Sequence, residues 1–114
     1  MTWTGIESVS PEAEYLYKQA RQLVDSQDFG EAMTLLQQAI EIEPDFSSAF
    51  NELGICAENL NKFDDAVNYY AKAVSCDPFH ADAWFNRGMS LKKIGREQDS
   101  AQCMERAIDL YCGR

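Results

Sequence analysis

The chain has 114 residues, of which 46% are apolar, and it carries 10 basic against 19 acidic residues, a formal net charge of −9. This size and apolar content are enough for one hydrophobic core. An acidic chain lacks the basic face that nucleic-acid binding needs, so no nucleic-acid partner is expected. No apolar run approaches the roughly 18 residues that a membrane span needs, so no membrane partner is expected either.

Six helices are predicted along the chain. Apolar residues recur at spacings of three and four, as in Leu16, Ala20 and Leu23. Ser10 and Pro11 form a typical helix start, because serine caps the first turn and proline fits within it. No stretch alternates with a period of two for long enough to indicate a strand. The predicted helices span residues 11–26, 30–42, 47–60, 64–76, 81–94 and 98–111.

Turn residues separate these helices. Pro44 and Pro78 disfavour helical geometry at the residue before them, so they end the second and fourth helices. The remaining breakers lie between the helices of each pair: Gln27-Asp28, Asn61-Lys62 and Gly95-Arg96. The pattern predicts three helix-turn-helix units.

The units repeat with a period of 34 residues, the distance between Pro44 and Pro78. We expect a leader at 1–12 and units at 13–46, 47–80 and 81–114, which together form one domain. Columns one period apart share size and polarity, as in Ala39, Ala73 and Ala107, or Ala20, Gly54 and Gly88. The small residues of the second column allow the two helices of a unit to approach closely. Stacking three units then buries a continuous core.

This pattern resembles the tetratricopeptide repeat family. The second unit carries the motif Phe50-x2-Leu53-Gly54-x2-Ala57, then Ala66-x3-Tyr70, Ala73 and Pro78. The third unit departs from it, with Ser100 in an alanine position and Cys112 in the proline position. The resemblance implies an all-α fold, a right-handed α-α superhelix of three repeats. It also implies a concave groove, lined by the first helix of each unit, in which a peptide or helical segment of a partner protein binds.

Residues three and four apart on each first helix, opposite its packed stripe, are expected to face this groove. The predicted peptide-binding residues are Tyr17, Lys18, Arg21, Asn51, Ile55, Phe85, Asn86, Met89 and Lys93. Aromatic and methionine side chains are typical anchors at such surfaces. The anchors of this kind are Tyr17, Ile55, Phe85 and Met89. The alternative is that Phe85 and Met89 only pack against the neighbouring unit.

A narrower possibility is recognition of a partner's C-terminal carboxylate. Some family members hold this group between basic and amide side chains on successive first helices, and Asn86-Arg87 resembles a fragment of that clamp. In the preceding unit, Asn51 and Ile55 stand where the clamp requires basic and amide groups. Recognition of a chaperone tail is therefore not predicted.

A second hypothesis concerns the end of the stack. Repeat stacks usually carry a polar capping element at each end, and no helix is predicted after the third unit. The columns that a following unit would cover continue into Ala101, Met104 and Ile108. These residues predict an apolar patch for homodimer formation or for docking onto a larger partner. A third interpretation makes the chain an accessory part of a larger enzyme.

The sequence offers little for catalysis. It has a single histidine, His80, and neither a glycine-rich phosphate loop nor a serine or cysteine nucleophile motif. None of its four cysteines is in C-x-x-C spacing. We therefore expect no catalytic residue, no metal and no cofactor. The free thiols, and a leader without the plan of a signal peptide, favour a reducing, cytoplasmic setting.

Overall fold

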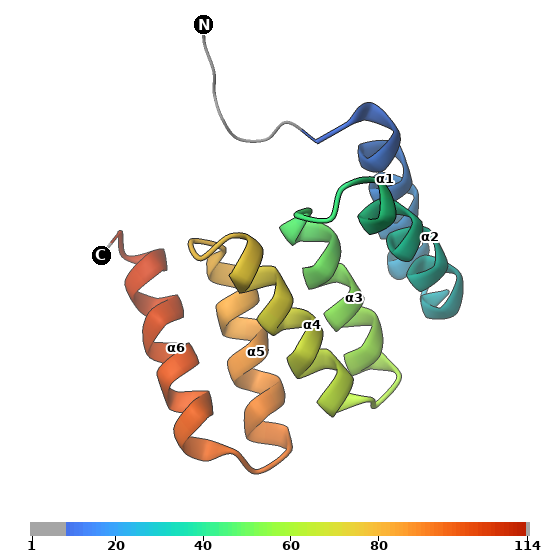
Figure 1. Ribbon diagram of the computed structural model, residues 1–114. Coiled ribbons are helices and arrows are strands. Elements are labelled where there is room, and N and C mark those ends of the chain that lie inside the picture. Colours follow the sequence, from blue (N-terminus) through green and yellow to red (C-terminus); the bar gives the residue numbers. More distant parts are fainter. Residues whose placement is uncertain (1–8, 114) are drawn as a thin grey trace, which may run out of the picture.

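The computed structural model describes residues 9–113, which form six helices and no strand (Figure 1). The helices are α1 (Pro11–Asp25), α2 (Phe29–Ile42), α3 (Ser47–Asn59), α4 (Phe63–Cys76), α5 (Ala81–Lys93) and α6 (Glu97–Tyr111). The predicted helices are confirmed, and each boundary agrees within one residue. Residues 1–8 of the expected leader, and Arg114, lie outside the described part of the chain. None of the described helices is long and apolar enough to cross a membrane.

The turns inside the three pairs share one backbone conformation. Gln27, Asn61 and Gly95 have φ values of 64°, 62° and 85°. This left-handed region suits glycine and is costly for other residues, so the repeated position marks a required tight turn. Between the pairs, Glu43 and Asp77 are extended, with φ values of −126° and −140°. That is the geometry which a following proline favours.

The first helix begins with the predicted cap. The Ala13 N–H donates to Ser10 Oγ at 3.2 Å, and Pro11 occupies the first helical position. The Ser10 N–H donates in turn to Glu43 Oε1 at 2.8 Å, at the end of α2. Both ends of the first pair are thereby joined.

Close approach within the second pair depends on Gly54. A Cβ atom at this position would lie 2.4 Å from Cε1 of Tyr70, on the facing helix α4. The Tyr70 ring is fully buried, and its hydroxyl donates to Glu58 Oε1 at 2.7 Å. The predicted small column thus makes room for a large aromatic side chain.

The third pair uses the same contact with different partners. Gly88 lies against Met104, whose Cγ would be 3.1 Å from an added Cβ. The buried Ser100 hydroxyl donates to the Gly88 carbonyl at 2.7 Å. Serine in this alanine position therefore adds a hydrogen bond between α5 and α6.

The core runs from pair to pair. One cluster extends from α1 to the start of α5 and includes the fully buried Leu36 and Leu53. The third pair adds a smaller cluster, in which Val67 of α4 packs with Leu91 and Cys103. Each pair therefore completes its core against its neighbour.

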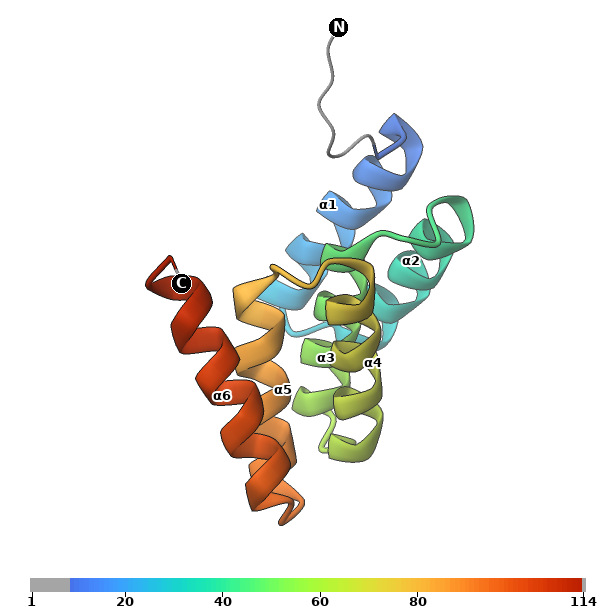
Figure 2. The same cartoon turned by 60° about the vertical axis from the view of Figure 1, so that its left-hand side comes forward.

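The stack curves around its first helices. Cα atoms of α3 approach those of both α1 and α5 within 8 Å, whereas within residues 9–113 α4 makes no such approach to α2 or α6 (Figures 1 and 2). Helices that are closer together lie on the inner side of a curved stack. We call the inner surface, formed by α1, α3 and α5, the first-helix face.

Candidate peptide-binding face

Side chains of α1 and α3 meet on the first-helix face through Arg21. Its Cζ lies 5.9 Å from the centre of the Tyr17 ring, and its Nε lies 3.8 Å from Glu52 Oε2. The Tyr17 ring packs in turn on Phe46, with 5.0 Å between ring centres. The predicted Tyr17 and Arg21 are thus held together between the first and second pairs.

Glu52 is a buried carboxylate in this arrangement, with 9% of its surface exposed. Burial raises the pKa of Glu52, Arg21 opposes this shift, and Asp25 adds to it. Burial also raises the pKa of Tyr17, and the Glu52 carboxylate adds to that shift. The pKa of Glu52 stays raised because the attraction of Arg21 is smaller than the effect of burial. This part of the face therefore disfavours negative charge.

Side chains of α3 and α5 meet through two amides. Asn86 Nδ2 donates to Asn51 Oδ1 at 3.2 Å, although the two residues are far apart in sequence. Asn51 is 7% exposed and Asn86 is half-buried, and among the described residues neither amide makes a further hydrogen bond, so Asn51 Nδ2 and Asn86 Oδ1 keep unused hydrogen-bonding capacity. One donor and one acceptor side by side match the N–H and C=O of an extended peptide.

The apolar side chains of α5 lie next to this amide pair in sequence. Phe85 is 42% exposed and Met89 is 37% exposed. Ile55 of α3 is half-buried and packs beside the cluster that contains Tyr70. Phe85 and Met89 therefore present more free apolar surface than the anchors expected on α1 and α3.

Both of the lysines expected in the groove form contacts with other side chains. The Lys18 ammonium lies 3.4 Å from Glu14 on the same helix, in an exposed pair. The Lys93 ammonium lies 5.3 Å from the centre of the Phe63 ring, at the start of α4. These contacts do not involve the Arg21 or Asn86 groups described above, and Lys93 lies two helical turns from Asn86.

Comparison with known proteins identifies the repeats. Residues 17–79 match the family described as Tetratricopeptide repeat, and residues 69–102 match a second model with the same description. The chain belongs to this family. Its six helices form an all-α tetratricopeptide repeat solenoid.

Two proteins of other organisms match parts of the chain. An uncharacterized protein of Methanocaldococcus jannaschii is 33% identical over 55 residues, which are 48% of this chain and 64% of that protein. A peroxisomal targeting signal receptor of Kluyveromyces lactis is 26% identical over 86 residues, which are 75% of this chain and 15% of the receptor. The chain thus spans less than two thirds of either relative.

Solved tetratricopeptide repeat structures have the same fold. The first repeat domain of Spaghetti (RPAP3), bound to the HSP90 peptide SRMEEVD, superposes with a TM-score of 0.88 at 18% identity, covering 96% of this chain and 87% of that one. YrrB, described as having an unusual peptide-binding site, superposes with a TM-score of 0.77 at 26% identity, covering 89% and 52%.

Arg87 lies away from the first-helix face, contrary to its interpretation as a fragment of a carboxylate clamp. It lines a cavity together with Trp84 of α5 and Cys103 of α6. The column of Arg87 could have indicated this position, since Leu53, one repeat earlier, is fully buried.

The predicted self-association patch on α6 is only partly open. Ala101 is exposed, and Ile108 is 54% exposed. Met104 is instead half-buried, because its side chain lies against Gly88.

The cysteines are free thiols. Cys56 and Cys103 are buried, Cys76 is half-buried and Cys112 is exposed. Burial, and then the Glu52 carboxylate, raise the pKa of Cys56 to about 11. In the part of the chain that the structure describes, no cluster of histidine, cysteine or acidic side chains could hold a metal ion.

Proposed function

We propose that this tetratricopeptide repeat chain is a non-enzymatic protein-interaction module whose first-helix face binds an extended segment of a partner protein. The observation that carries the proposal is the exposure of Phe85 and Met89 beside the Asn51–Asn86 amide pair. An apolar anchor next to a free donor and acceptor can hold both a side chain and the backbone of a peptide.

The electrostatics of the face favour a segment with basic or uncharged residues over an acidic one. Glu52 is buried, and Arg21 offsets only part of the cost of burying its negative charge. The chain as a whole has a formal net charge of −9. A basic side chain near Glu52 would be attracted, whereas a carboxylate would be repelled.

The comparisons support a binding role in general terms. One relative is named as a receptor for a targeting signal, and two solved structures of this fold are described by the peptides or peptide-binding sites that they contain. A short unstructured segment must be ordered when it binds, so we expect an affinity on the order of micromolar.

The test has two stages. Affinity capture with mass spectrometry gives candidate partners, and peptides that tile each candidate are then titrated by fluorescence anisotropy. The double variant F85A/M89A should weaken the binding of a true ligand by about tenfold or more. The control is F79A, because Phe79 is also an exposed aromatic residue, 72% exposed, but lies in the turn before α5. Equal affinities of F85A/M89A and the parent chain would refute the proposal.

A second candidate function is self-association through α6. The exposed Ile108, with Ala101 on the same helix, favours it. Light scattering over a range of concentrations should then show a dimer that I108K disrupts. A strict monomer at high concentration would reject this function.

A further inference from the structure

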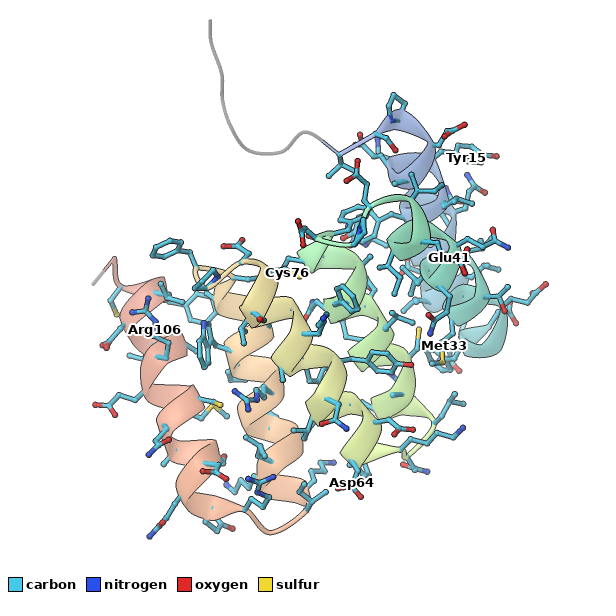
Figure 3. The ribbon with its side chains drawn as sticks, viewed as in Figure 1. Tyr15, Met33, Glu41, Asp64, Cys76 and Arg106 are labelled. Atoms are coloured by element: carbon cyan, nitrogen blue, oxygen red, sulfur yellow. The ribbon has the colours of Figure 1, made fainter. Side chains whose placement is uncertain are left out.

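A cavity of about 440 Å³ lies between the two helices of the third pair. Trp84, Arg87 and Leu91 of α5 line it, and α6 contributes residues that include Cys103 and Arg106. Figure 3 marks Arg106 on α6. The Trp84 indole is fixed at one side of the cavity, because its Nε1–H donates to the Pro78 carbonyl at 2.8 Å.

The repeat pattern explains why there is space here. The corresponding region of the second pair holds Tyr69, whose hydroxyl accepts a hydrogen bond from Gln37 Nε2 of α2 at 3.4 Å. One period later the position of Tyr69 is taken by the small Cys103. The outer helices diverge, and at this position the third pair has no large side chain to fill the gap.

The cavity gathers positive charge in an acidic protein. Arg87, Arg96 and Arg106 line it, which are three of the five arginines of the chain. The one acidic residue in the lining, Asp99, lies 2.5 Å from Arg96. Three positive charges and one negative charge leave a net charge of +2 in a chain of −9.

Within the part of the chain that the structure describes, two of the three guanidinium groups have no acidic partner. No ion pair among residues 9–113 involves Arg87 or Arg106. The Nε of Arg87 is also buried without a hydrogen-bond acceptor. Burying an unmatched charged donor is costly, and an anion in the cavity would offset this cost.

We propose that this cavity binds a phosphate monoester, with the phosphate between Arg87 and Arg106 and its organic group beside Trp84. Two guanidinium groups and a net charge of +2 match a phosphate dianion, which has enough oxygens for both. A carboxylate has one negative charge and two oxygens, which one arginine can satisfy. The cavity is in the size range of small-molecule sites and leaves space beside the phosphate. The site is separate from the first-helix face and does not depend on peptide binding there.

The probe is O-phosphoserine at pH 7.5, titrated into the full chain and followed by ¹H–¹⁵N NMR at the Trp84 indole and the amides of α5 and α6. Serine, acetate and inorganic phosphate are compared at equal ionic strength. We expect saturable shifts with phosphoserine and none with serine. Stronger binding of phosphoserine than of inorganic phosphate identifies the monoester as the ligand, and the reverse order identifies the free ion.

The variants use residues that the chain itself carries in the same columns. R87L copies Leu53, R106Q copies Gln38, and C103Y copies Tyr69 and fills the space without changing any charge. Each should weaken phosphoserine binding by about tenfold or more, since a charge-assisted contact or the space itself is lost.

The matched control is K92Q, which removes one positive charge from an exposed position of α5 outside the cavity lining. It should leave phosphoserine binding unchanged. R106Q changes a side chain that is partly exposed, so it keeps the test valid if C103Y fails to fold. No saturable shift up to tens of millimolar, equal binding of acetate, or equal loss in K92Q and R106Q would each overturn the proposal.

Discussion

Substituting alanine for Gly54 tests the close contact between α3 and α4. The position is in the middle of a helix, where alanine is intrinsically favoured over glycine by about 1 kcal/mol. The added Cβ would, however, lie 2.4, 2.6 and 2.7 Å from three carbons of the Tyr70 ring. Carbon atoms prefer separations of roughly 3.5–4.0 Å, so the ring must move by about 1 Å.

The cost of this movement exceeds the gain in helix propensity. Tyr70 is fully buried, and its hydroxyl is fixed on Glu58 Oε1 at 2.7 Å. Overpacking a core costs about 1–3 kcal/mol, and weakening a hydrogen bond adds about 1 kcal/mol. We expect G54A to lower the free energy of unfolding by roughly 2 kcal/mol, or Tm by about 8 °C.

The chain supplies its own rescue variant. One period earlier, the same two columns hold Ala20 and Leu36, so alanine is accepted opposite a smaller side chain. In the Y70L background, G54A should therefore cost at least about 1 kcal/mol less than in the parent chain. Urea unfolding followed by circular dichroism measures all four corners of this cycle. The control is G30A, at an exposed glycine where an added Cβ would meet no atom of another part of the chain within 4 Å, and it should not destabilise. An unchanged Tm for G54A, or an equal loss in both backgrounds, would refute the steric explanation.

Three further predictions concern single side chains. S10A should lower the free energy of unfolding by about 1 kcal/mol in urea melts, because the Ala13 N–H loses its cap, whereas S10T should retain most of it. Burial raises the pKa of Glu52, so its stabilising contribution is complete below pH 4.5 and is lost as pH rises through the folded-state pKa. E52Q should therefore be more stable than the parent at pH 7 but not at pH 4, and a lower Tm at pH 7 would contradict this. Ellman's reagent should modify Cys112 first and Cys56 last, because Cys112 is exposed and burial raises the pKa of Cys56 to about 11; equal rates would be evidence against a closed core.

The fold was predictable because its signals are local and repeated. Prolines, turn residues and the spacing of apolar residues act within a few positions, and the period of 34 residues allowed one unit to support the next. The positions of the turns at Gln27, Asn61 and Gly95 were predicted on this basis, and the structure shows the positive φ that makes these turns tight.

The candidate site was less predictable, because it depends on contacts between units. Helical spacing placed Tyr17 and Arg21 on one face, but it could not show that Glu52 is buried between α1 and α3. The resemblance of Asn86-Arg87 to a clamp fragment did not take account of the column of Arg87, in which Leu53 is buried. The cavity of the third pair depends on the absence of a large side chain at Cys103, and only a comparison with Tyr69 makes this visible.

The deep burial of α3 in the middle of the stack affects the dynamics of the whole stack. Eight of its residues are buried, against two in α1 and three in α6. Because each pair depends mainly on its neighbours, opening of an outer pair leaves the remaining contacts of α3 in place. Amide hydrogen exchange should therefore be slowest in α3 and faster toward α1 and α6. The amide pair on α3 and α5 then connects the most protected helix to one that opens more readily, so a ligand that engages both should slow exchange chiefly in α5.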